Sequence, residues 1–164
     1  MNATRSVQGA RYTPPTDVRT TRLLQVLPTE RCIPTNQHRQ LELKGTEKRS
    51  ADPMLYYAGT IHLLQRPCVA IVGSREVSGN GRCRTRRLAR ELVAAGVVVV
   101  SGLAAGVDAA AHRMAIQEGE RTTAVLGTGL ARAFPTVHSH IQEEIYRDHL
   151  LVTPFAFGAG GSSG

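Results

Sequence analysis

The sequence contains no tryptophan, only three phenylalanines and four tyrosines among its 164 residues, and almost no lysine. Its three cysteines (Cys32, Cys68 and Cys83) form no CxxC pair and leave an odd thiol, which argues against a zinc knuckle and a disulfide framework. No apolar run approaches the roughly 18 residues of a membrane span, and the first residues lack the apolar core of a secretory signal. These absences predict a protein of the reducing cytoplasm, with no membrane contact, metal or cofactor.

Positive charge, in contrast, is abundant. The formal net charge is +7, and all but two of the 20 basic residues are arginine, the exceptions being Lys44 and Lys48. This balance favours polyanionic partners such as nucleic acids, although arginine-rich chains are also typical of GC-rich genomes. The charge therefore bears on partners and leaves the fold open.

Composition divides the chain into three parts. Residues 1–50 have low apolar density, frequent proline and excess basic charge, which predicts a partly disordered arm with one short buried helix over 18–27. Residues 51–157 carry the regular pattern of one domain, introduced by a short edge strand over 52–59. Residues 158–164 form a Gly/Ser-rich tail.

Strand and helix patterns alternate from Cys68 onward. Apolar β-branched runs that end in glycine loops predict buried strands, and a 3.6-residue apolar period between them predicts helices. Repeated βα units of this kind predict an α/β fold, Rossmann-like and doubly wound, with a mainly parallel sheet and flanking helices. The predicted strands are 68–72, 97–100, 122–126 and 150–153; the predicted helices end near Ala95, run from Asp108 to Gly119, and contain Val137, Ile141 and Ile145.

Three glycine-containing loops follow these strands and should line the same edge of a parallel sheet, where ligands bind in this class. The turn Gly73-Ser74-Arg75 is predicted to be a phosphate site, because it joins a strand to a helix and carries a planar five-donor guanidinium. The predicted phosphate-binding residues of this turn are Gly73, Ser74 and Arg75, and Arg82 and Arg86 on the first helix are candidate contacts to a polyanion.

Two features of these helices allow alternative interpretations. The arginines at 82, 84, 86, 87 and 90 of the first helix either contact a polyanion or form a solvated face in which Arg87 pairs with Glu91. Asp108 and His112 stand one turn apart and either form an acid–base pair, or Asp108 caps the helix while His112 packs in the core.

Familiar enzyme motifs are missing. The spacing of Gly73, Gly79 and Gly81, which are placed in the first loop, is not GxGxxG, and no acidic residue ends the second strand to hold a ribose. No GxxxxGK[ST] occurs, and no nucleophile, base and oxyanion donor assemble from the sequence. We therefore expect a binding protein without catalysis.

Three segments resemble the DNA-processing protein A (DprA, also Smf) family. They are Cys68-Val-Ala-Ile-Val-Gly-Ser-Arg75, Val98-Val-Val-Ser-Gly-Leu-Ala-Ala-Gly-Val-Asp-Ala-Ala-Ala-His112 and Thr123-Ala-Val-Leu-Gly-Thr-Gly-Leu130. The resemblance implies an extended Rossmann fold that binds single-stranded DNA without sequence preference and loads RecA onto it during natural transformation. It also implies that Gly73, Ser74 and Arg75 hold backbone phosphate and that the two later glycine loops form further walls of the same pocket. The second wall would be Ser101, Gly102, Leu103, Ala104, Gly106 and Asp108, and the third Gly127, Thr128 and Gly129.

The resemblance covers roughly residues 53–155 and lacks the family's later Phe-Pro-x-x-Asn-Arg segment, so the domain is expected to be incomplete. The sheet is expected to stop at residues 150–153 with an exposed strand edge, which makes a second copy of the chain a candidate partner beside RecA. The alternative is a nucleotide sensor or small nucleotide-processing enzyme of the related Lonely Guy type, although Gly127-Thr-Gly129 lacks that group's catalytic glutamate.

Overall fold

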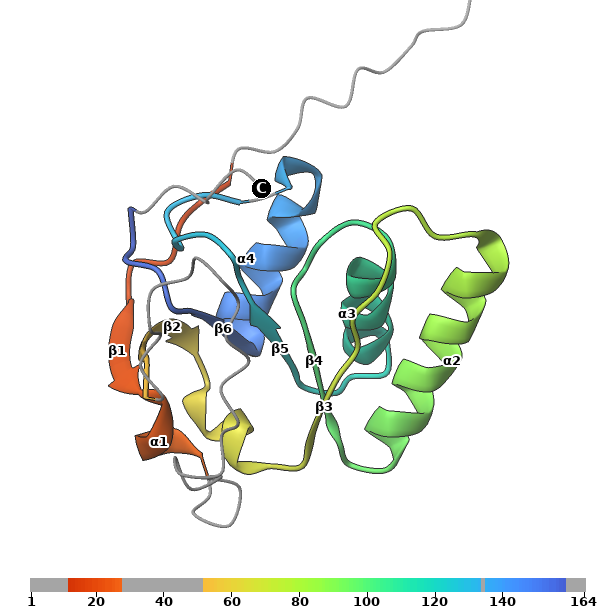
Figure 1. Cartoon of the computed structure of the whole chain (residues 1–164), viewed down its shortest axis with the longest axis horizontal. Helices are drawn as coiled ribbons and strands as arrows, with labels where there is room; N and C mark the ends of the chain where they lie inside the picture. Colours follow the sequence, from red (N-terminus) through yellow and green to blue (C-terminus); the bar gives the residue numbers. More distant parts are fainter. Residues whose placement is uncertain (1–11, 28–51, 134, 159–164) are drawn as a thin grey trace, which may run out of the picture.

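The computed structural model describes residues 12–27, 52–133 and 135–158, in which six strands form one mixed sheet of order β1-β2-β6-β5-β4-β3 (Figure 1). The strands are β1 (Arg19–Arg22), β2 (Met54–Gly59), β3 (Cys68–Ala70), β4 (Val98–Ser101), β5 (Thr122–Val125) and β6 (Leu150–Thr153). The helices are α1 (Leu23–Val26), α2 (Gly79–Ala94), α3 (Val107–Gln117) and α4 (Ser139–Asp148), with 3-10 turns η3 (Ile61–Gln65) and η4 (Thr136–His138).

The second half of the chain forms the parallel part of the sheet. Strands β3, β4, β5 and β6 are neighbours in sequence order and are joined through α2, α3 and α4. The predicted Rossmann-like α/β class with a mainly parallel sheet is therefore confirmed. Because the order runs in one direction, all three helices cover the same sheet face, in the order α4, α3, α2 across the molecule (Figure 1). The described part of the sheet is therefore wound on one face, whereas the doubly wound arrangement expected from the sequence would place helices on both.

The first half of the chain adds two antiparallel strands beyond β6. Strand β2 pairs with β6 on one side and with β1 on the other. The expectation that the sheet stops at residues 150–153 with a free edge was therefore wrong, and so was the expectation that 52–59 is an edge strand. The edges are β1 and β3. Each is short, and exposed Arg19 and Arg22 lie on β1, which disfavours further strand pairing.

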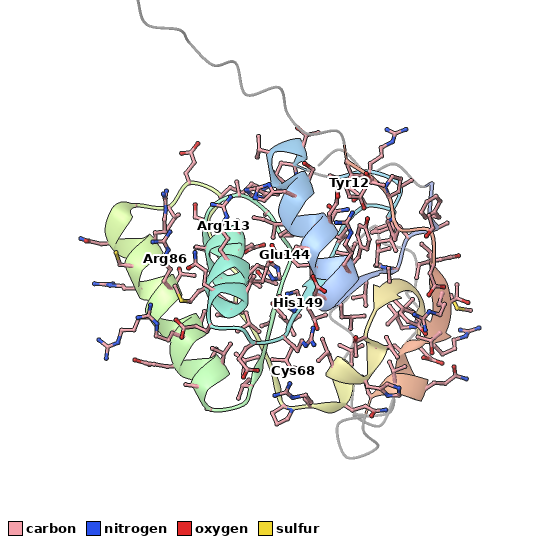
Figure 2. The ribbon with its side chains drawn as sticks, turned by 180° about the vertical axis from the view of Figure 1, so that it is seen from behind. Tyr12, Cys68, Arg86, Arg113, Glu144 and His149 are labelled. Atoms are coloured by element: carbon pink, nitrogen blue, oxygen red, sulfur yellow. The ribbon has the colours of Figure 1, made fainter. Side chains whose placement is uncertain are left out.

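The N-terminal segment lies against the domain over its described part. The short helix expected over 18–27 is present as α1, but none of its residues is buried. Tyr12 donates its hydroxyl hydrogen to the carbonyl of Leu130, and Figure 2 shows it beside α4. The rest of the predicted arm, 1–11 and 28–50, and the predicted tail beyond Gly158 lie outside the described residues.

The core has two layers because the sheet has two faces. On the helix side, Val99 of β4, Ala124 of β5 and Leu151 of β6 are fully buried under α2, α3 and α4. On the other side, Leu63 of η3 packs with a second set that includes Val98. Burial of this apolar area is the main favourable term in folding and holds the loop-bearing edge of the sheet in place.

Candidate nucleic-acid interface

Three glycine-containing loops meet at the carboxyl edge of the parallel strands, as the βα pattern predicted. They follow β3, β4 and β5, and they lie along one edge of the molecule in Figure 1. Cys68, the first residue of β3, lies at the opposite edge in Figure 2. The candidate site is therefore a surface formed by loops 71–78, 102–106 and 126–133.

Close backbone contact joins the first loop to the second. The backbone N–H of Val107 donates to the carbonyl of Ser74 at 3.1 Å. A Cβ atom at Gly106 would overlap the carbonyl oxygens of Ser74 and Arg75, and one at Gly73 would lie 2.7 Å from a methyl carbon of Val107. Both glycines are thus needed for the approach of the two loops, since any side chain would force them apart.

Arg75 is exposed on this loop and forms no ion pair within the described part of the chain. The carboxylate of Asp108, which could have paired with it, forms no hydrogen bond to its guanidinium there. Ser74 is engaged locally, because its hydroxyl accepts from the N–H of Glu76 at 3.1 Å and donates to the carbonyl of the same residue at 2.6 Å. The Ser74 hydroxyl therefore stabilises the backbone of the turn, and the guanidinium of Arg75 remains exposed to solvent.

Helix α2 begins earlier than the sequence predicted. Its N-cap is Ser78, whose hydroxyl accepts from the N–H of Gly81 at 3.1 Å. Gly79 and Gly81, expected in the loop, therefore form the first helical turn, because the serine cap satisfies a backbone donor there. The N-terminus of α2, where the positive end of the helix dipole attracts anions, therefore begins three residues after Arg75 in the chain.

The arginines of α2 divide into paired and unpaired groups. Arg87 binds Glu91 at 2.8 Å, as one interpretation predicted, and Arg90 binds Glu118, the C-cap residue of α3, at 2.9 Å. Arg82, Arg84 and Arg86 are exposed and form no ion pair with any described residue. Arg82 and Arg86 stand one turn apart as like charges, and a bound anion would relieve their repulsion.

A strained turn ends β4. Leu103 is fully buried and has a positive φ of 61°, a conformation uncommon outside glycine. Buried His138, in η4 after the third loop, donates its Nδ1 hydrogen to the Leu103 carbonyl at 3.1 Å, and burial lowers the pKa of His138. This bond joins the second loop to the segment after the third. The sequence offered no signal for it, because the two residues are 35 positions apart.

Asp108 and His112 do not form an acid–base pair. The hydroxyl of Thr122 donates to the Val99 carbonyl at 2.7 Å and accepts from Nδ1 of His112 at 2.9 Å. Burial lowers the pKa of His112 to about 4, so this imidazole is neutral in the fold at ordinary pH. His112 is a core residue, as the second interpretation predicted.

Asp108 is also not the helix cap, which is Gly106, the residue before the first helical position of α3. Asp108 lies buried in the first turn, where its charge complements the helix dipole. A Cβ at Gly102 would lie 2.9 Å from its Oδ2, so the carboxylate packs directly against the second loop.

The third loop rests on the segment that follows β6. A Cβ at Gly129 would overlap the carbonyl oxygens of Ala156 and Phe157, and the N–H of Ala131 donates to the latter at 3.0 Å. On the neighbouring strand, Ser101 is buried and its hydroxyl donates to the Ile71 carbonyl at 2.6 Å. The Ser101 side chain therefore supports the edge from inside the sheet.

The predicted site residues consequently divide into three groups by exposure. The outer, exposed set is Gly73, Ser74, Arg75, Arg82, Arg86 and Gly127; Gly102, Ala104, Gly106 and Thr128 are half-buried; and Ser101, Leu103, Asp108 and Gly129 are buried. The structure brings the three loops to one edge. Only the first two groups present surface to a ligand, and the buried residues hold the loops from beneath.

Within residues 12–27, 52–133 and 135–158, no three His, Cys, Asp or Glu side chains cluster closely enough to hold a metal ion. No helix in the same part of the chain is both long and apolar enough to cross a membrane.

Comparison with known proteins identifies relatives over most of this region. Residues 30–162 match the family model described as DNA recombination-mediator protein A. The DNA processing protein DprA of Streptococcus pneumoniae is 40% identical over 113 residues, which are 69% of this chain and 40% of that protein. Protein Smf of Synechocystis is 39% identical over 114 residues, or 67% of this chain and 29% of that protein. The chain thus spans less than half the length of these relatives.

Solved structures agree with this assignment. DNA processing protein A from Streptococcus pneumoniae superposes with a TM-score of 0.70 at 32% identity, covering 90% of this chain and 47% of that one. The Helicobacter pylori protein, whose structure was solved for its single-stranded DNA binding mode, has a TM-score of 0.62 at 32% identity over 68% of this chain and 51% of its own. Sequence and fold together show that this chain belongs to the DNA recombination-mediator protein A family.

Proposed function

We propose that this chain binds single-stranded DNA through its backbone phosphates along the carboxyl edge of the sheet, with Arg75 as the central contact. The observation that carries the proposal is the exposed guanidinium of Arg75, which forms no ion pair with any residue that the structure describes and lies on a turn that packs against Gly106 and Val107. Such a fork suits phosphate, because two parallel N–H donors match two phosphate oxygens. Reported single-stranded DNA binding by the Helicobacter pylori relative supports this ligand.

Arg82 and Arg86 extend the site along α2. Both are exposed and unpaired in the described structure, so each is available to neutralise a phosphate. Backbone contacts of this kind do not distinguish bases, and the proposed binding is therefore independent of sequence. It involves no catalytic step and no cofactor.

The wider role proposed is in DNA processing during natural transformation, with RecA as the protein loaded onto the bound strand and with a second copy of the chain as a further partner. This extension rests on family membership, and the chain spans less than half the length of its relatives. The compartment proposed is the cytoplasm, on the odd number of cysteines without a CxxC pair.

The test is a titration of labelled oligo-dT at two salt concentrations. Each phosphate neutralised should lower the logarithm of the binding constant by about 0.7 per logarithm of salt, so several contacts give a steep slope. A free mononucleotide that binds without such a slope, while oligo-dT fails to bind, would favour the nucleotide-sensor alternative instead. Arg82→Gln combined with Arg86→Gln should flatten the slope.

Substitutions at Arg75 separate geometry from charge. Both Arg75→Ala and Arg75→Lys should lose about ten- to a hundredfold in affinity, because an ammonium keeps the charge and loses the paired hydrogen bonds. Arg147→Ala is the matched control, since this exposed arginine lies in the last turn of α4, away from the loops. Full affinity in Arg75→Lys would mean that only the positive charge at position 75 is needed for binding. Full affinity in Arg75→Ala would contradict the proposed role of Arg75.

A further inference from the structure

Phe157 is an exposed aromatic side chain beside the third glycine loop. The chain has only three phenylalanines and no tryptophan, and 41% of Phe157 is exposed, whereas Phe155 is half-buried. It follows β6 and so lies on the carboxyl side of the sheet, as do the loops that carry the proposed phosphate site. The ring is therefore partly accessible to a ligand at this edge.

The backbone that carries this ring is held from several directions. Its carbonyl accepts from the N–H of Ala131, and the absence of a side chain at Gly129 lets Ala156 and Phe157 pack on that glycine. Just before it, the N–H of Phe155 donates to the hydroxyl of buried Thr153 at 3.1 Å. The ring is thus attached to a segment tied to both β6 and the third loop.

We propose that Phe157 stacks on a nucleobase of the strand whose phosphates the neighbouring loops bind. This inference rests on the proposed function and adds a base contact to it. Every base has a π-face, so an aromatic platform next to a basic edge adds affinity without sequence preference. β6 and β3 are three strand spacings apart, which puts the segment after β6 about 14 Å from the Arg75 loop, a distance that a few nucleotides span.

Binding to two oligomers tests the base contact directly. Phe157→Ala should weaken oligo-dT binding roughly 5- to 100-fold, whereas Phe157→Tyr should bind like the unmodified chain. An abasic oligomer of the same length should bind both the unmodified chain and Phe157→Ala equally, because it retains phosphates and has no base to stack. The salt slope should be unchanged in Phe157→Ala, since no ionic contact is lost. Leu24→Ala, at an exposed apolar residue of α1, is the control.

A fluorescence reporter gives an independent readout, because Phe157→Trp would carry the only tryptophan of the chain. Saturation with oligo-dT should quench its emission, and the abasic oligomer should leave it unchanged. Leu24→Trp should respond to neither oligomer.

The outcomes separate the two proposals. If the unmodified chain binds neither oligomer with a salt slope, the proposed function fails. If it binds both with a slope, while Phe157→Ala retains full oligo-dT affinity or Phe157→Trp is not quenched, the stacking inference alone is overturned.

Discussion

The two faces of the sheet present similar β-branched side chains, but different elements pack on each face. On the helix face, Val99 and Leu151 have no exposed surface, whereas near the carboxyl end of the other face Val72 is 78% and Val125 is 41% exposed. Parallel strands are normally covered on both faces. In the described chain, η3 covers only the part of this second face around Val98. We call the uncovered part, Ala70, Val72 and Val125, the open patch. The difference shows that burial here depends on what packs on a strand.

The largest expected effect comes from removing a side chain beneath the helices. Leu151→Ala should lower the free energy of unfolding by about 2 to 5 kcal/mol, because it leaves a cavity in a close-packed core. Val125→Ala, on the adjacent strand and facing the other way, should cost far less. Urea denaturation of both variants measures the contrast, and equal losses would mean that the open patch is covered in solution.

Acid should weaken the helix face specifically. The pKa of His112 is lowered to about 4 in the fold, chiefly by burial, against about 6.5 in an unfolded chain. The unfolded state therefore binds more protons between these values. The stability tied to neutral His112 is complete above pH about 6.5 and is lost as the pH falls toward 4, by up to about 3 kcal/mol.

Unfolding in urea at neutral pH and near pH 4.5 measures this loss. His112→Gln should unfold with a shallower pH dependence. His62→Gln, at an exposed histidine of η3, should keep the original dependence. A His112→Gln variant that loses stability with acid as steeply as the original chain would assign the effect to other groups, among them His138 and His149, whose pKa values burial also lowers.

Glycine substitutions extend the comparison to the loops at the carboxyl edge of the sheet. Gly106→Ala should cost about 2 kcal/mol or more, because its φ is +82° and a Cβ would overlap two carbonyl oxygens of the first loop. Gly96→Ala is the matched control, since its φ is +76° but a Cβ there meets nothing within 4 Å. It should cost about 1 kcal/mol from backbone strain alone. Thermal unfolding of both variants tests whether loop contact adds to strain.

The smallest effect is expected in the open patch. Val72→Ser and Val125→Thr should change the free energy of unfolding by no more than about 0.5 kcal/mol, because both side chains already contact solvent. The same substitutions should reduce any self-association seen by sedimentation, since they remove exposed apolar area. A stability loss near that of Leu151→Ala would contradict the contrast between the faces.

Local patterns predicted the parallel half of the fold. The β-branched run before Ser101 and the helical period through Met114 are properties of short segments, as are the glycines that follow β4, β5, α2 and α3. The order of strands, helices and loops could therefore be predicted from the sequence. Pairing was not. Strand β2 was misplaced at an edge because its two partners, β1 and β6, lie in distant parts of the chain, and nothing local at residues 52–59 indicates them.

The site divides in the same way. The sequence by itself determined that three glycine loops and Arg75 meet at one edge, because alternating βα units bring all carboxyl ends together. Only the tertiary structure decided which polar groups remain available to a ligand. The Ser101 hydroxyl is engaged by Ile71 and the Leu103 carbonyl by His138, whereas the guanidinium of Arg75 forms no ion pair in the described structure. A hydrogen bond between residues 30 or more positions apart depends on how the whole chain packs, and no local pattern encodes it.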